Sequence, residues 1–169
     1  KALNAHLVEW PVAILKAEPV SPDFHARFSA VSKLYTYRIL NRQAPPTFDL
    51  GRVWHIRRPL DVEKMQQAAH HLLGKHDFTT FRDAECQGKS PVKTIDRYDI
   101  TREGEEVVFR VRGRSFLHKQ VRRMTGTLSH VGEGKWSPLD VKQALEARDG
   151  TKGGVCAPPD GLYLTSIDY

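Results

Sequence analysis

Long apolar runs and cysteines are scarce in this sequence. No apolar run approaches the ~20 residues that a membrane-spanning helix needs, so we expect no membrane partner. The only two cysteines, Cys86 and Cys156, lie far apart and show no pairing pattern, which argues against a disulfide-stabilised scaffold and favours a reducing cytoplasm. The chain starts at Lys1 rather than Met and lacks the apolar core of a signal peptide. We therefore expect a processed, truncated or renumbered piece of a longer protein.

The common cofactor and catalytic motifs are also missing. Neither G-x-x-x-x-G-K-[ST], G-x-G-x-x-G nor G-x-S-x-G occurs. Eight histidines are present, but His70–His71 and His76 do not follow metal-ligand spacing, so we interpret them as solvated or capping side chains. A carboxylate-based hydrolase needs two convergent acids, and the sequence shows no such pair. The sequence therefore predicts neither a cofactor nor a metal.

Acidic residues are absent from one long stretch, between Val107 and Gly132. The cations of this stretch supply +6, which equals the net charge of the whole chain. Guanidinium groups match phosphate geometry, so the pattern favours a nucleic-acid partner over a solvated charged face. Strand alternation also predicts that three of these arginines share one side, next to a cationic helix flank. The cations are Arg110, Arg112, Arg114, Lys119, Arg122 and Arg123.

The order of predicted elements indicates a single α+β domain over residues 1–169, because strands and helices alternate without regular βα repetition. Helices are predicted from an Asp61 N-cap to Gly74, over the apolar stripe from Leu117 to Val131, and from a Ser137 N-cap to Gly150. The predicted strands are Trp10–Ala17, Lys33–Leu40, Arg52–Arg58, Lys93–Thr101, Glu105–Arg112 and Leu162–Ile167.

Two tyrosines alternate along one predicted strand, at Tyr35 and Tyr37. Aromatic side chains on a strand can stack on unpaired RNA bases. Aromatic residues at this spacing also commonly belong to a hydrophobic core. We expect a core position for at least one of the two.

Three separate stretches resemble the bacterial tRNA pseudouridine synthase A family. Residues 24–30 read F-H-A-R-F-S-A and are followed by the K-L-Y-T-Y of residues 33–37. Residues 116–126 resemble the family's F-x-x-x-x-V-R-x-x-x-G helix, and residues 157–164 its closing A-P-P-x-G-L-x-L. The order and spacing fit across essentially the whole chain. The resemblance implies an α+β fold whose mixed, mainly antiparallel sheet carries helices on one face.

The resemblance also implies an activity and a set of site residues. Enzymes of this family convert uridine into pseudouridine in the anticodon stem-loop of tRNA, without a cofactor, and work as homodimers. By motif position, Tyr35 packs against the target base and Leu162 forms part of the apolar pocket wall. Arg122 pairs with the catalytic aspartate, and Arg27 contacts phosphate.

One motif of the family is not found in these 169 residues. The catalytic aspartate belongs to a G-R-T-D-x-G-V-H-A stretch, and no such stretch occurs here. We therefore expect this chain to be the C-terminal portion of such an enzyme and to be inactive by itself. The alternative is a non-catalytic RNA-binding module of RRM-like shape. Residues 111–116 match the RRM signature poorly, because Arg114 stands where an aromatic residue is needed.

Overall fold

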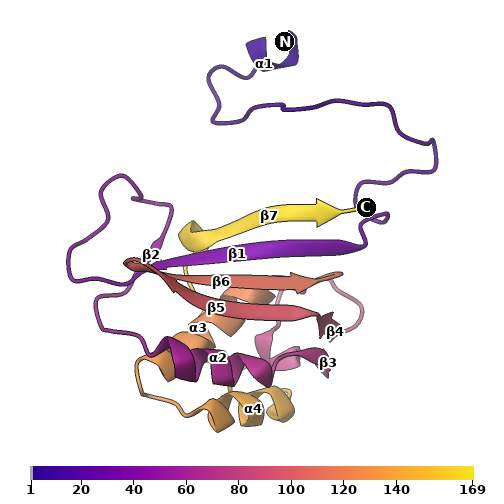
Figure 1. Ribbon diagram of the computed structural model, residues 1–169. Coiled ribbons are helices and arrows are strands. Elements are labelled where there is room, and N and C mark those ends of the chain that lie inside the picture. The colour runs from indigo at the N-terminus through magenta and orange to yellow at the C-terminus, as the bar shows by residue number, and fades with distance from the viewer. Residues whose placement is uncertain (1) are drawn as a thin grey trace.

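Strand β1 is the centre of the main sheet in the computed structural model, which describes residues 2–169. One edge of β1 pairs antiparallel with β6, and β5 continues the sheet on that side. The other edge pairs antiparallel with β7 and, at its far end, parallel with the short β2. Figure 1 shows β7, β1, β6 and β5 side by side. The strands are β1 (Ser32–Leu40), β2 (Trp54–His55), β5 (Arg97–Glu103), β6 (Glu106–Gly113) and β7 (Leu162–Asp168).

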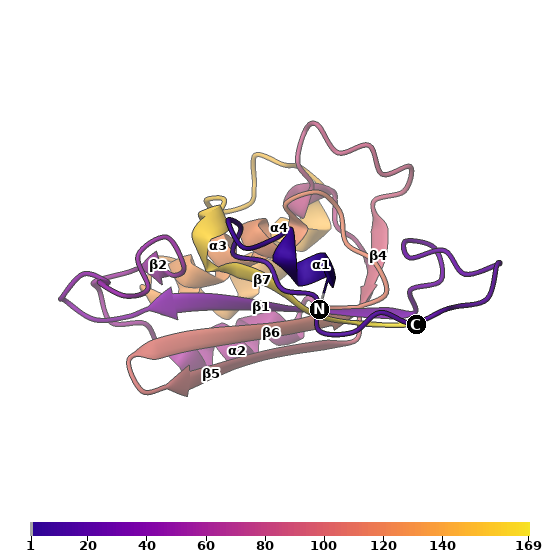
Figure 2. The same cartoon turned by 90° about the horizontal axis from the view of Figure 1, so that it is seen from above.

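Three helices lie on one face of this sheet, as Figures 1 and 2 show. They are α2 (Val62–His70), α3 (Gln120–Gly132) and α4 (Pro138–Ala147). A two-stranded sheet of β3 (Gly74–Asp77) and β4 (Val92–Ile95) lies beside them, and single turns of 3-10 helix occupy Thr79–Phe81 and Pro159–Gly161. The mixed, mainly antiparallel α+β fold expected from the sequence is confirmed. None of the helices described between residues 2 and 169 is long and apolar enough to cross a membrane.

Two helices begin where the sequence predicts. The Asp61 carboxylate accepts a hydrogen bond from the Lys64 N–H at 3.0 Å and caps α2. The Asp140 carboxylate accepts from the Ser137 N–H at 2.6 Å at the start of α4. The predicted ends are less accurate, because α2 already ends at His70 and Gly74 instead begins β3 with a φ of 89°.

The start of α3 also differs from the prediction. The helix begins at Gln120 rather than Leu117, and the Gln120 side-chain oxygen accepts the Leu117 N–H at 2.8 Å. Lys119 at its N-cap has a φ of 57°, in the left-handed region that most side chains avoid.

The predicted strand at Trp10–Ala17 is wrong. This segment is irregular and exposed, following a short α1 (Ala2–Ala5) outside the main sheet. An apolar run becomes a strand only where the edge of a neighbouring strand pairs with its backbone hydrogen-bonding groups. Residues 10–17 pair with no strand among residues 2–169.

The predicted strand at Lys93–Thr101 is in fact two strands. It breaks at Asp96 into β4 and β5, which belong to different sheets. Ile95 and Tyr98 are both buried although they lie three residues apart; on one continuous strand they would point to opposite faces, and one of them would lie on the face of the main sheet that carries no helices. The second of these strands, β5, forms an antiparallel hairpin with β6 that turns at Gly104, which has a φ of 62°.

The segment of residues 150–157 lies directly on the backbone of α3. The Ala157 N–H donates to the Arg122 carbonyl at 3.2 Å, and the Gly154 N–H donates to the Thr127 hydroxyl at 2.9 Å. A Cβ on Gly126 would lie 1.8 Å from the Val155 carbonyl oxygen, so only glycine permits this approach. The contact holds the chain that leads into β7 against the helix.

Replacing Gly126 by alanine should destabilise the protein by about 2 kcal/mol, because the added methyl group overlaps the Val155 carbonyl. Helix propensity alone predicts the opposite sign, a gain of about 1 kcal/mol. The free energy of unfolding in urea distinguishes the two. Gly150→Ala is the matched control, since its Cβ would meet nothing closer than 4.0 Å. Equal stability of the two variants would contradict the proposed close contact.

Candidate active site

Three segments far apart in the sequence meet at one cavity of about 410 Å³. Tyr35 comes from β1, Arg122 from the first turn of α3, and Leu162 from the first residue of β7. The family resemblance implies that Tyr35 and Leu162 contact the target base and that Arg122 pairs with the catalytic aspartate, and the structure brings all three together. Lys33, Phe116 and Gln120 also line the cavity.

Tyr35 lies on the face of β1 that carries the helices. Its ring meets the Phe116 ring edge-on, with centroids 5.1 Å apart. Burial raises the pKa of its hydroxyl, so this group stays neutral at physiological pH. Tyr37, two residues along, is completely buried and donates its hydroxyl proton to the Pro158 carbonyl at 2.7 Å. The expectation that at least one of these tyrosines belongs to the core is therefore confirmed.

Arg122 is anchored through one edge of its guanidinium group. Its Nε–H donates to the Ala157 carbonyl oxygen at 2.6 Å, while the Ala157 N–H returns a bond to the Arg122 carbonyl. No carboxylate among residues 2–169 lies within ion-pair distance of this group. The remaining N–H groups of a half-buried cation can therefore bind an anion that enters the cavity.

A carboxylate from a distant loop holds the start of α3. Asp83 accepts from the Lys119 ammonium at 2.9 Å and lies 3.5 Å from the His118 ring. Hydrogen bonds from Lys119 and from the Glu85 N–H, together with the charge of Lys119, keep the Asp83 pKa below its usual range. This contact lies where Lys119 has its left-handed backbone, one turn before Arg122. It therefore fixes the helix end that carries Arg122.

Half of the cations between residues 107 and 132 are paired with acids from outside that stretch. The fold therefore brings acidic residues from other segments next to a stretch that contains none of its own. The pairs are Arg110–Glu103 (2.6 Å), Arg112–Asp168 (2.6 Å) and Lys119–Asp83 (2.9 Å).

These cations also do not share one surface, which corrects the interpretation drawn from strand alternation. Phe109 and Val111 point into the core beneath the helices, so Arg110 and Arg112 lie on the opposite, helix-free face of the sheet. The helix cations Arg122 and Arg123 belong to α3, on the covered face. Moreover, β6 is an interior strand, because it pairs with β1 on one side and with β5 on the other.

The other residues expected to contact RNA differ in their exposure and in the hydrogen bonds and ion pairs that they already form within the protein. Arg114 is exposed at the end of β6 and has no ion pair among residues 2–169. The Arg123 Nη2 donates to the Gly150 carbonyl at 2.6 Å. Arg27 is exposed and lines a second, larger hollow next to the cavity.

Two residues of this region were not assigned from the sequence. Phe116 stands at the first position of the quoted helix motif, so the motif itself contained its signal. Asp83 offered no such signal, because it lies 36 residues before its partner Lys119 and no local pattern links them.

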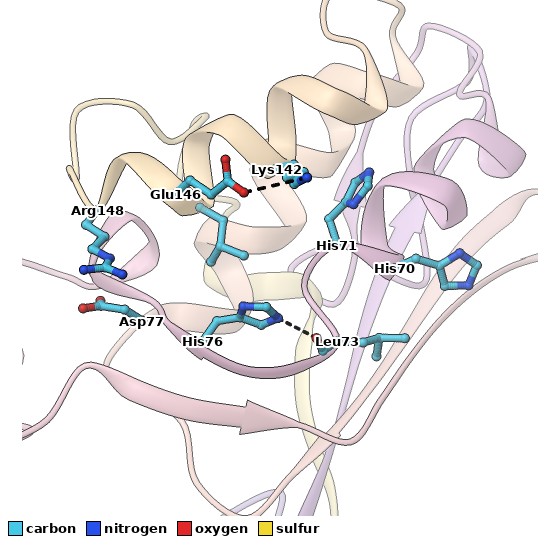
Figure 3. A pocket seen from close by; sticks show the side chains of 9 residues that line it. His70, His71, Leu73, His76, Asp77, Lys142, Glu146 and Arg148 are labelled. Atoms are coloured by element: carbon cyan, nitrogen blue, oxygen red, sulfur yellow. Dashed lines mark hydrogen bonds and ion pairs between the residues drawn. The ribbon is translucent and has the colours of Figure 1, made fainter.

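Three of the eight histidines, His70, His71 and His76, line a different hollow, of about 330 Å³, at the C-terminal ends of α2 and α4 (Figure 3). One ring nitrogen of His76 is bonded to the Leu73 carbonyl oxygen at 2.6 Å. Within residues 2–169, no three His, Cys, Asp or Glu side chains are placed to hold a metal ion. These histidines therefore do not contribute to the cavity at Tyr35.

Comparison with known proteins identifies the family. A family model described as tRNA pseudouridine synthase matches residues 68–169. The chain belongs to the tRNA pseudouridine synthase family. It is 57% identical over 168 residues to tRNA pseudouridine synthase A of Caulobacter sp. (strain K31) and 56% identical over 168 residues to the one of Maricaulis maris (strain MCS10). Each alignment covers 99% of this chain and 68% of the relative.

Family membership confirms the resemblance seen in the motifs. The chain corresponds to a portion of such an isomerase rather than to its full length, since it covers 68% of these relatives. The match also favours an enzyme of this family over an RRM-like binding module.

Asp83→Asn should lower the free energy of unfolding at neutral pH. It should also make that free energy depend less on pH in the acidic range. The folded state lowers the pKa of Asp83, so its contribution is present above the ordinary carboxyl pKa of ~3.9 and is lost as pH falls through the lowered value. Urea unfolding of both proteins between neutral and acidic pH measures this. The stability difference should shrink with falling pH.

The same experiment in a Lys119→Gln background supplies the control. There the asparagine substitution should cost much less, because the cation that stabilises the carboxylate is gone. An undiminished cost would show that Asp83 acts through other partners.

Proposed function

We propose that this chain holds the target uridine of an isomerase that forms pseudouridine in the anticodon stem-loop of tRNA. The observation that carries the proposal is the meeting of Tyr35, Arg122 and Leu162 at one cavity. Family membership supplies the reaction class.

The reaction places specific demands on such a cavity. The glycosidic bond from uracil N1 to ribose breaks, the ring reattaches through C5, the C5 proton leaves and N1 gains one. The base must first leave the RNA stack, and contacts with the protein have to offset the lost stacking. Tyr35 and Leu162 supply aromatic and apolar surface for the base, and the edge contact with Phe116 fixes the Tyr35 ring.

Arg122 provides the electrostatic part of the proposed mechanism. The Ala157 carbonyl fixes its guanidinium group through Nε, so the charge stays at the cavity without reorganisation. In the family, the partner of this arginine is the catalytic aspartate. A fixed cation favours the ionised form of such a carboxylate, the form in which it can attack the nucleoside or remove a proton.

Phosphate contacts complete the proposed site. We assign Arg27, Arg114 and Arg123 to the RNA backbone around the cavity, Lys119 to a weaker contact there because it is already paired with Asp83, and Arg110 and Arg112 to weaker contacts on the helix-free face. The ion pairs of Arg110 and Arg112 support this ranking, because a paired guanidinium has to exchange its carboxylate for phosphate.

We also infer that the protein works in the cytoplasm as a homodimer, as the family resemblance implies. The outer edge of β7 supports self-association, because β7 pairs only with β1 among the strands of residues 2–169. A strand edge with free backbone groups tends to associate with other chains. Exposed apolar side chains in the N-terminal segment, such as Trp10 and Leu15, add to this tendency.

Residues 1–169 alone should not isomerise uridine in an unmodified tRNA transcript, because they carry no G-R-T-D motif. Joining them to the part of the Caulobacter relative that this chain does not cover should yield turnover, measured as pseudouridine by mass spectrometry. In the joined protein, Arg122→Gln should reduce turnover about 100-fold through loss of the fixed charge.

Gln143→Ala, on the exposed side of α4, is the control for this series and should leave turnover unchanged. Turnover by residues 1–169 alone would overturn the inference that the nucleophile is missing from them. An inactive joined protein that folds and binds tRNA would count against the proposed function.

Arg114→Gln should weaken tRNA binding and lower the slope of log K against log salt by about 0.9, the value for one lost phosphate contact. Arg112→Gln should change the slope less, because Asp168 already neutralises that side chain. Fluorescence anisotropy across a salt series measures both. Equal slope changes would show that the ion pair does not limit phosphate binding.

A further inference from the structure

A hollow of about 850 Å³ lies directly beside the cavity at Tyr35. The two share three residues, Phe116, Leu117 and His118. Its other walls come from the loop at residues 85–88, from Arg27 and Ser115, and from Lys93 on β4. We call it the flanking hollow. A ligand that extends beyond the Tyr35 cavity on this side enters the flanking hollow next.

The loop wall of this hollow is held in place by polar contacts. The Arg82 Nη2 donates to two carbonyl oxygens of the loop, Cys86 at 2.7 Å and Gly88 at 3.0 Å. The His118 N–H lies 3.4 Å from the Cys86 sulfur and donates to it, which ties the loop to the segment before α3. Fixed walls reduce the entropy cost of binding a ligand.

The chemistry of the flanking hollow matches one nucleotide of a single strand. Arg27 and Lys93 line the hollow with a single acid, Glu85, so its net charge is positive and a phosphate is favoured. Phe116 supplies an aromatic surface, and the Gln87 side-chain amide supplies donors and an acceptor for a base. Its volume lies within the range of small-molecule sites.

The position of Phe116 relates the two spaces. Its ring contacts Tyr35 edge-on and lines both the Tyr35 cavity and the flanking hollow. A base against Tyr35 and a second base in the flanking hollow would therefore share Phe116 as their common wall. That arrangement suits two consecutive nucleotides of an unpaired strand.

We propose that the flanking hollow binds the nucleotide adjoining the target uridine, with its phosphate on Arg27 and Lys93 and its base against Phe116 and Gln87. This inference rests on the proposed function, because it takes the Tyr35 cavity as the site of the target base. Stacking accepts any base, so the site reads an unpaired strand rather than a sequence.

The test uses residues 1–169 and fluorescently labelled anticodon stem-loop RNAs in anisotropy titrations. One RNA is intact, one has an abasic residue at the target position, and two have an abasic residue at the position before or after it. Loss of a stacked base should weaken binding by about 5- to 100-fold. We expect this loss at the target and at one of the two neighbours.

Protein variants then locate each loss. Phe116→Leu should reduce the penalty for the abasic neighbour to less than about two-fold, because the base then has no ring to stack on, and Gln87→Ala should reduce this penalty in part by removing the amide. Lys93→Gln should weaken all four RNAs and lower the salt slope by about 0.7. The matched control is Lys142→Gln, which removes a lysine from the separate hollow in Figure 3 and should change nothing.

The outcomes separate this inference from the proposed function. If Tyr35→Leu removes the penalty at the target but no variant changes the penalty at a neighbour, the flanking hollow does not bind the adjoining nucleotide and the proposed function stands. If Tyr35→Leu leaves the target penalty intact, or none of the RNAs binds, both are wrong. The far-UV circular dichroism and unfolding free energy of Gln87→Ala, a change at an exposed loop residue, check that the fold is retained.

Discussion

The contact between residues 150–157 and helix α3 sets the geometry of the proposed site. Gly126 lets the Val155 carbonyl reach the helix backbone, and the Ala157 backbone then bonds Arg122 in both directions. The same segment leads through a single 3-10 turn into Leu162 at the start of β7. One close backbone approach thus positions both the cation and the apolar wall of the cavity. Because β7 pairs with β1, this arrangement also brings Leu162 beside Tyr35.

Charge in this protein is arranged by the fold rather than by the local sequence. All charged residues from residue 107 to residue 132 are basic. Three of them nevertheless pair with carboxylates that lie on β5, on β7 and in the loop after Phe81. An uninterrupted basic segment therefore overstates the free positive charge. The Asp83–Lys119 pair also shows that such a partner can have a positional role, because it holds the first turn of α3 where the backbone is left-handed.

The sequence predicted most elements, for reasons that are local. Capping residues start α2 and α4 near their true positions, and alternation separates buried Phe109 and Val111 from the arginines of β6. Prediction from the sequence failed where contacts with a distant part of the chain decide whether a segment forms a strand. Trp10–Ala17 has strand-like composition but no edge to pair with among residues 2–169, and the break at Asp96 follows from burying both Ile95 and Tyr98.

By itself the sequence determined the family, the α+β class and the identity of the three cavity residues, because motif spacing and local propensity are properties of neighbouring residues. Only the tertiary structure decided which residues touch. It joined Tyr35, Arg122 and Leu162 in one cavity, linked Asp83 to Lys119, separated the strand arginines from the helix cations, and placed the flanking hollow beside the cavity. Such contacts join residues tens of positions apart, and packing around a common core, not any local pattern, brings them within bonding distance.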